Sequence, residues 1–195
     1  MKIFEKRGRG RPRAFDRDLA LERAMELFRE HGFEGTSLSD LTQAMGLSPS
    51  SLYATFGDKE ALYRAAVERY LDGPGAYMAR VLALPGSARE VYEQLMTEAA
   101  NQLSGGGCMV ALGALHCSPQ ARAVQDSLLY RRRQSVAAMA ARIPAEELPF
   151  TVTPFQVASF YMAVLQGMSV QARDGAQEAE LLGVARLAMA AWPED

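Results

Sequence analysis

Residues 36 to 59 read Thr-Ser-Leu-Ser-Asp-Leu-Thr-Gln-Ala-Met-Gly-Leu-Ser-Pro-Ser-Ser-Leu-Tyr-Ala-Thr-Phe-Gly-Asp-Lys and predict two short helices joined by a glycine turn. Ser37 is placed to cap the first helix, because its hydroxyl can accept a hydrogen bond from a free backbone N–H in the first turn. Gly46 supplies the left-handed residue that ends this helix. Ser48 followed by Pro49 marks a second helix start, since proline at the first helical position sacrifices no hydrogen bond.

The second of these helices has one apolar and one polar side. Leu52 and Phe56 lie four residues apart, so they share the side that is buried. The outward side carries only short side chains, which are Ser50, Ser51, Ala54 and Thr55. Hydroxyl and methyl groups of this size let a helix backbone approach base edges in the major groove of DNA. An ordinary helical hairpin is the alternative interpretation of the two helices alone.

The run Ser48-Pro49-Ser50-Ser51-Leu52-Tyr53, followed by Phe56, Lys59-Glu60 and Leu62, resembles the DNA-binding signature of the TetR family of bacterial transcriptional regulators. The resemblance is dense over about residues 14 to 70 and diffuse beyond. It implies two sets of DNA contacts: phosphate contacts from Thr36, Ser48, Tyr53 and Lys59, and base contacts from Pro49, Ser50, Ser51 and Thr55. The family often has lysine or another polar residue at the position of Pro49, so the resemblance carries no base preference.

A basic segment precedes this region. Residues 1 to 13 contain six Lys or Arg and one Glu, which gives a local charge of +5 on a chain whose net charge is −2. Arg9-Gly10-Arg11-Pro12 resembles the core of an AT-hook, in which Arg side chains enter the narrow minor groove of A·T-rich DNA. We therefore expect Arg9 and Arg11 to contact DNA. A basic tail that binds only phosphates is the alternative.

Composition and length bound the rest of the chain. With 195 residues and 49% hydrophobic content, it can bury a substantial core. Uncharged apolar runs of 18 residues and a secretion signal are both lacking, so we expect a cytoplasmic protein without a membrane partner. Two cysteines do not make a disulfide framework. Phosphate-loop, nucleophile–His–acid and paired-carboxylate motifs are missing, so we expect neither an enzyme nor a cofactor.

The helical periodicity predicts an all-α fold, and the resemblance implies the roles of its parts. These are a flexible basic arm (1–13), a three-helix helix-turn-helix domain (14–58, with the motif at about 37–56), a connecting helix (59–72), and a larger helical bundle to which the resemblance assigns effector sensing and dimerisation (73–195). In the bundle, the helices expected at about 154–173 and 177–191 are apolar on more than one side and must be covered on both. A two-helix dimerisation face accounts for this pattern and would pair two reading helices on a palindrome. Packing of both helices within their own subunit is the alternative.

The resemblance also implies a small-molecule pocket in the bundle. The candidate effector or redox-sensing residues are Cys108, Met109, Cys117, Met162 and Gln166. Cys108 follows a glycine turn, as in family members that sense oxidants or electrophiles, although a free cysteine is also a common small core residue. We expect no metal site, because Cys108 and His116 would lie about 12 Å apart along one helix.

These features together predict a sequence-specific transcriptional regulator. We expect a repressor that binds a palindromic operator as a homodimer and is released by a small-molecule or redox signal. An architectural A·T-rich DNA-binding protein without an effector is the alternative, but it leaves residues 48 to 59 unexplained.

Overall fold

The computed structural model describes residues 16–193, and this part of the chain is helical without strands. The predicted arm, with Arg9 and Arg11, lies outside the described residues. The α-helices are α1 (Arg17–His31), α2 (Leu38–Met45), α3 (Pro49–Phe56), α4 (Lys59–Asp72), α5 (Tyr77–Leu82), α6 (Ala88–Leu103), α7 (Met109–Leu112), α8 (Arg122–Ala141), α9 (Pro154–Arg173) and α10 (Glu178–Met189). Short 3₁₀ helices lie at Pro74–Ala76, Pro119–Ala121 and Ala145–Glu147. The all-α prediction is confirmed.

Local capping sets the starts of the first helices. Asp16 accepts hydrogen bonds from two backbone N–H groups of α1, and Ser37 forms a reciprocal capping box with Asp40 in α2. Gly46 adopts the left-handed conformation with φ of +66° and ends α2, as the sequence predicts. Ser48 caps α3 and is followed by Pro49 in the first turn. Helices α2 and α3 therefore form the expected hairpin.

Short 3₁₀ turns lead into two of the helices. Helix α4 ends at Asp72, and the 3₁₀ turn at Pro74–Ala76 leads directly into the short helix α5. Helix α8 begins at Arg122, directly after the 3₁₀ turn at Pro119–Ala121. In both places proline sits in the first turn of the 3₁₀ segment, where it needs no N–H partner.

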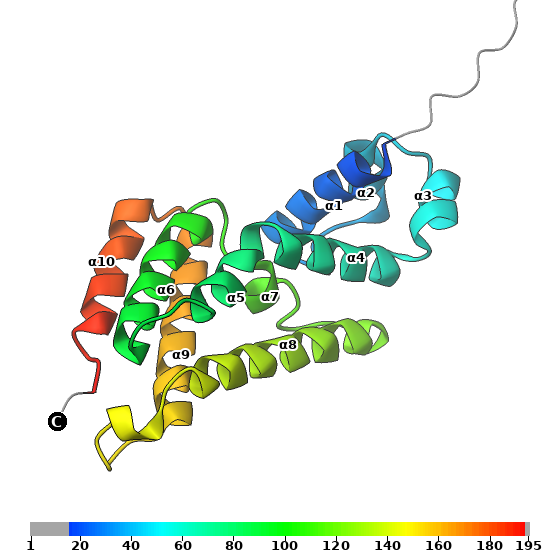
Figure 1. Ribbon diagram of the computed structural model, residues 1–195. Coiled ribbons are helices and arrows are strands. Elements are labelled where there is room, and N and C mark those ends of the chain that lie inside the picture. The colour runs from blue at the N-terminus through cyan, green and yellow to red at the C-terminus, as the bar shows by residue number, and fades with distance from the viewer. Residues whose placement is uncertain (1–15, 194–195) are drawn as a thin grey trace, which may run out of the picture.

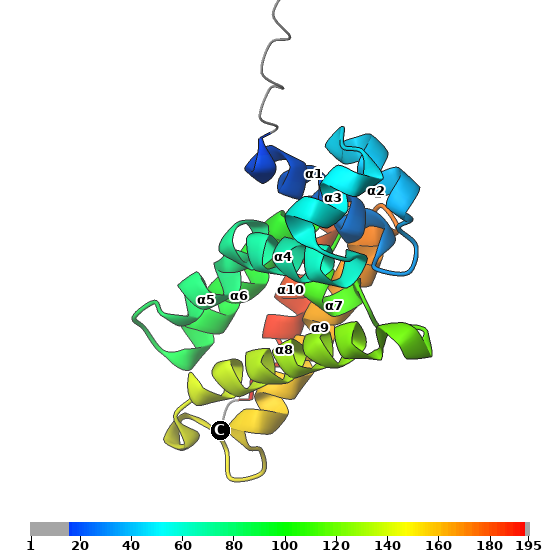
Figure 2. The ribbon, with the colours of Figure 1, turned by 90° about the vertical axis from the view of Figure 1, so that its right-hand side faces the viewer.

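The helices occupy two ends of one elongated molecule. Helices α1, α2 and α3 lie at one end, and α10 lies at the other (Figure 1). Helix α4 runs from the α3 end toward the middle, where α5 continues, while α8 extends along the opposite side (Figures 1 and 2). Helices α6, α9 and α10 pack together around a core that includes the ring pairs Tyr92–Tyr161 and Tyr92–Trp192.

A second core joins the end formed by α1, α2 and α3 to the middle of the molecule. Its buried residues come from α1 to α4 and also from α7, the loop after it and the start of α8, where Met109, Ala114, Val124 and Leu128 contribute. Polar contacts follow the same route, because the backbone N–H of Phe33 donates to the carbonyl of Gly113 at 2.8 Å. Hydrophobic contacts therefore continue across the end of the predicted helix-turn-helix domain.

The end of α1 is held by arginines. Arg29 donates from Nε to the carbonyl of Gly107 at 3.0 Å and from Nη2 to that of Gln102 at 3.1 Å. Arg173, at the end of α9, donates to the carbonyl of Arg29 itself at 3.0 Å. These bonds connect α1 to α6, to the loop before α7 and to α9. Within residues 16–193, the helices are all too short or too polar to cross a membrane.

Candidate functional site

Helix α3 presents the predicted reading surface. Ser48, Pro49, Ser50 and Tyr53 are exposed. The remaining predicted residues, Ser51 and Thr55, are half-buried, whereas Leu52 and Phe56 are buried against the other helices. The apolar residues thus anchor the helix, and its small polar residues stay accessible. The short side chains let this side of α3 approach the floor of a groove such as the major groove of DNA.

Three serine hydroxyls gather at the start of α3. The Oγ of Ser48 accepts from the backbone N–H of Ser51 at 3.2 Å. It also lies 3.0 Å from the Oγ of Ser50 and 2.9 Å from that of Ser51. The positive end of the helix dipole lies at the same point, so this group of hydroxyls suits an anion such as a DNA phosphate.

Thr36, a further predicted phosphate contact, points inward. Thr36 is fully buried, and its hydroxyl donates to the carbonyl of Gly32 at 2.7 Å. In this position the side chain closes the loop after α1. The sequence places Thr36 next to the capping residue Ser37, which gives no sign that it turns inward.

Lys59, another predicted phosphate contact, lies at the start of α4 and is half-buried. Its Nζ sits 4.3 Å from the centre of the Phe33 ring, within the range of a cation–π interaction. Burial lowers the pKa of Lys59, while the nearby carboxylate of Glu34 acts in the opposite direction. The ammonium therefore has an aromatic partner that fixes it beside the reading helix.

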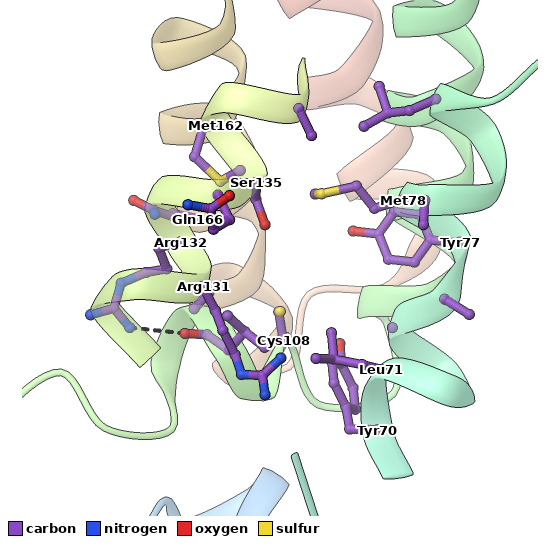
Figure 3. Close-up of a pocket in the computed structure, with 18 of the residues that line it drawn as sticks. Tyr70, Leu71, Tyr77, Met78, Cys108, Arg131, Arg132, Ser135, Met162 and Gln166 are labelled. Carbon is purple, nitrogen blue, oxygen red and sulfur yellow. Dashed lines mark hydrogen bonds between the residues drawn. The ribbon is translucent and has the colours of Figure 1, made fainter. Parts of the chain in front are cut away.

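A cavity of about 490 Å³ opens between α4, α5 and α8, with α7 and α9 behind it. Cavities of this size commonly hold drug-sized ligands. Figure 3 shows its main side chains. The residues that line it are Tyr70, Leu71, Gly75, Ala76, Tyr77, Met78, Ala79, Leu82, Cys108, Val110, Ala111, Ser127, Tyr130, Arg131, Arg132, Gln134, Ser135, Ala138, Met162 and Gln166.

The cavity brings together three of the five predicted effector residues. Cys108, Met162 and Gln166 line it. Met109 and Cys117 do not, because both are buried in the core shared by α4, α7 and α8. Burial raises the pKa of the Cys117 thiol, which disfavours the reactive thiolate. Three of the five candidate residues therefore share this cavity, and Met109 and Cys117 lie outside its lining.

Several polar groups face the cavity without a protein partner. Figure 3 shows the hydroxyls of Tyr77 on α5 and Ser135 on α8 directed into the space between these helices. Among the described residues, neither these hydroxyls nor the amide of Gln166 forms a hydrogen bond to protein. Burial raises the pKa of Tyr77, so its phenol remains a donor at neutral pH. These groups are available to a bound molecule.

Two arginines border the same cavity. Arg131 on α8 forms an ion pair with Glu68 on α4. Arg132 donates from Nη1 to the carbonyl of Val110 at 2.9 Å, the bond drawn in Figure 3. Sequence reasoning missed Tyr77, Arg131 and Ser135. The run Arg131-Arg132-Arg133 was an available signal, because consecutive helical residues point in directions about 100° apart and cannot all face solvent alike.

Comparison with known proteins matches this geometry. The family described as bacterial regulatory proteins, tetR family, matches residues 20–66. The HTH-type transcriptional repressor ComR of Escherichia coli K12 is 34% identical over 198 residues, covering 97% of this chain and 94% of its own. BdcR of the same strain, also described as an HTH-type transcriptional repressor, is 30% identical over 92% of this chain and 90% of its own.

A solved structure is also similar over nearly the whole chain. It is a cysteine mutant of the TetR family regulator CifR, bound to 26-bp double-stranded operator DNA. It shares 42% identity and a TM-score of 0.87, covering 94% of this chain and all of that one. The reading helix, the helical bundle and the full-length similarity to ComR agree, and the chain belongs to the TetR family of sequence-specific, DNA-binding transcriptional regulators.

Proposed function

We propose that this regulator is a homodimeric repressor that binds a palindromic operator through two copies of α3 and is released by a small molecule in the cavity. One observation carries the proposal. Helix α4 forms a wall of the cavity and begins at Lys59, so that only two residues separate it from the end of α3 at Phe56. A molecule that displaces α4 therefore acts directly on the reading helix. No catalytic activity is needed, and the proposed place of action is the cytoplasm.

The proposed DNA contacts follow from the accessible side of α3. Ser50, Ser51, Thr55 and Pro49 face bases in this proposal, and Ser48, Tyr53 and Lys59 contact phosphates. Small hydroxyl side chains provide few hydrogen bonds to bases, so phosphate contacts supply much of the affinity. The basic arm at 1–13, with Arg9 and Arg11, adds phosphate or minor-groove contacts. We retain the division into this arm, a reading domain (14–58), a connecting helix (59–72) and a bundle (73–195).

The proposed dimer interface lies on α9 and α10. Phe160 and Val170 on α9 are 46% and 47% exposed, and Leu187 on α10 is 76% exposed. Gly167 and Gly183 lie within the same two helices, and an added Cβ at either position would meet no atom within 4 Å. Large apolar side chains beside small residues form a surface that a second copy can cover. A two-fold pair would hold two α3 helices about 34 Å apart, one turn of DNA.

The proposed release is a shift between two orientations of α4. A ligand lowers operator affinity only by the ratio of its affinities for the two states. Cys108 lies in the cavity wall, so a thiol-reactive ligand would reach the same place. A redox signal and a reversible ligand would then act on the same helix.

Selection of bound sequences from random DNA, using the full chain, tests the proposal. We expect one palindrome, and we expect Ser51→Ala and Thr55→Val each to weaken it relative to random DNA. Ser104→Ala, an exposed serine at the end of α6, is the matched control and should change nothing. Equal binding to all DNA of similar A·T content would refute the proposal and favour the architectural alternative. A small-molecule panel and a thiol oxidant, added in repeat selections, test release.

A further inference from the structure

We infer that the cavity selects apolar molecules bearing one carboxylate, and that Arg131 binds this carboxylate in exchange for Glu68. The inference rests on the proposed function, since it names the class of effector that the cavity accepts. It concerns the side chains around the cavity and not the reading helix.

The cavity wall has an unbalanced composition. Most of its surface comes from aromatic, thioether and aliphatic groups, which include Tyr70, Leu71, Met78, Leu82 and Met162. Among the described residues, the cavity lining includes two arginines but no aspartate, glutamate or lysine. An apolar body would cover the wall, and a negative charge would compensate the bordering cations.

Arg131 is the cation in position to meet that charge. In Figure 3 its side chain extends from α8 along the edge of the cavity toward Tyr70 on α4. Arg132 is held on the other side, where its guanidinium donates to the Val110 carbonyl of α7. A single available guanidinium matches one carboxylate, because the two can form paired, charge-assisted hydrogen bonds. The ligand class is therefore a monoanion.

Glu68 is the group that the ligand must replace. It pairs with Arg131 while its side chain remains 59% exposed, against 30% for that of Arg131. Because the Glu68 carboxylate is already mostly hydrated, separating it from Arg131 costs little free energy, and an exposed ion pair contributes little to stability. Arg131 is the less exposed partner, so its guanidinium remains at the cavity edge when the ion pair separates. Replacing the Glu68 carboxylate by that of a ligand therefore costs little free energy.

The exchange has a mechanical result. Glu68 belongs to α4 and Arg131 to α8, so their ion pair ties the two helices across the cavity. The neighbouring Arg69 instead ties α4 to α1 through Glu22 at 2.7 Å. A carboxylate ligand that takes Arg131 removes this polar tie at the cavity, while α4 keeps its ion pair to α1 and its core contacts with Val124 and Leu128 of α8. Loss of the tie favours a shift of the cavity end of α4 relative to α8.

The test uses a matched pair of probes. The neutral dye N-phenyl-1-naphthylamine reports whether the cavity of the full-length protein accepts an apolar molecule. 4-Phenylbutyrate and 4-phenylbutyramide then compete with the dye, because they have the same shape and differ in charge. We expect the acid to bind about tenfold more tightly than the amide, the effect of one charge-assisted contact.

Variants assign the preference to side chains. Arg131→Gln should remove the preference for the acid, and Glu68→Gln should raise acid affinity about threefold while leaving the amide unchanged. Glu22→Gln breaks another ion pair of α4 outside the cavity and should leave the ratio unaltered. If Arg131→Gln fails to fold, Glu68→Gln still tests the exchange.

The outcomes separate the two proposals. Dye binding with equal competition by acid and amide would overturn this inference and leave the effector cavity intact. A preference for the acid that persists in Arg131→Gln, or that Glu68→Gln does not increase, would also overturn it. If neither the dye nor either competitor bound, the effector cavity itself would be refuted, and this inference with it.

Discussion

Replacing Gly107 by alanine should destabilise the protein at the junction between the two cores. Gly107 is buried before α7 and has φ of +80°, a conformation that costs other residues energy. An added Cβ would lie 2.6 Å from the backbone oxygen of Ser169 in α9 and 3.3 Å from Leu112 Cδ1. The first of these neighbours is a helix backbone atom, so relief requires α7 or α9 to move.

Two costs contribute to the expected loss. The left-handed backbone conformation costs about 1–2 kcal/mol for a residue with a Cβ. Overpacking against a fixed backbone adds about 1–3 kcal/mol. A total near 3 kcal/mol corresponds to a fall in Tm of roughly 6–12 °C, at about 2–4 °C per kcal/mol for a chain of this length. Displacement of the Gly107 carbonyl would also disturb its hydrogen bond from Arg29.

Gly175→Ala separates the two costs. Gly175 follows α9 with φ of +100°, and an added Cβ there would meet nothing within 4 Å. The loss of stability in Gly175→Ala should therefore contain only the cost of the left-handed backbone conformation. Denaturant unfolding of both variants, at one protein concentration because a dimer unfolds in a concentration-dependent way, measures the difference. If Gly107→Ala were no less stable than Gly175→Ala, the packing argument for the junction would be wrong.

Three further predictions address other parts of the molecule. Leu187→Glu should give a monomer in light scattering and weaken operator binding, because a dimer interface would bury the new carboxylate without a partner; a dimer that persists would contradict the proposed interface. Tyr63→Phe should leave the thermal midpoint unchanged or raise stability by about 1 kcal/mol, since the buried Tyr63 hydroxyl has no hydrogen-bond partner among residues 16–193; a clear loss would reveal an unseen partner. The hydrogen bond from the backbone N–H of Ser118 holds the pKa of Glu34 below its usual 4.5, so its stabilisation is complete above that pH and is lost as the pH falls through the lowered pKa. Glu34→Gln should therefore flatten part of the acid-side fall in thermal midpoint, measured from neutral pH down to about 3; an identical pH profile would exclude this contribution.

The helical hairpin could be predicted from sequence because its determinants are local. Ser37, Gly46 and Ser48 act within four residues of their own positions, through caps and a turn that the structure contains. Spacing of Leu52 and Phe56 likewise fixes which side of α3 is buried. Such short-range patterns can be interpreted without knowledge of the tertiary structure.

The cavity and the inward turn of Thr36 could not be predicted in the same way. Tyr77 and Ser135 are far apart in sequence and become neighbours only when α5 and α8 pack on opposite sides of one space. Cys108 and Met109 are adjacent, yet one lines the cavity and the other is fully buried in the core. The orientation of a four-residue helix such as α7 depends on its neighbours, because so short a helix has no periodicity to indicate its buried side.

The packing of aromatic rings determines how a signal at the cavity can travel. Tyr63 of α4 meets the rings of Phe28 and Phe33 edge-on, with ring centres 4.8 and 5.2 Å apart. This close-packed contact joins the start of α4 to α1 and to the loop before α2, and packed interiors resist gradual deformation. In the proposed release, ligand binding at the other end of α4 therefore moves α1 to α4 together. The two copies of α3 in the proposed dimer then change their spacing on DNA while α3 keeps its own structure.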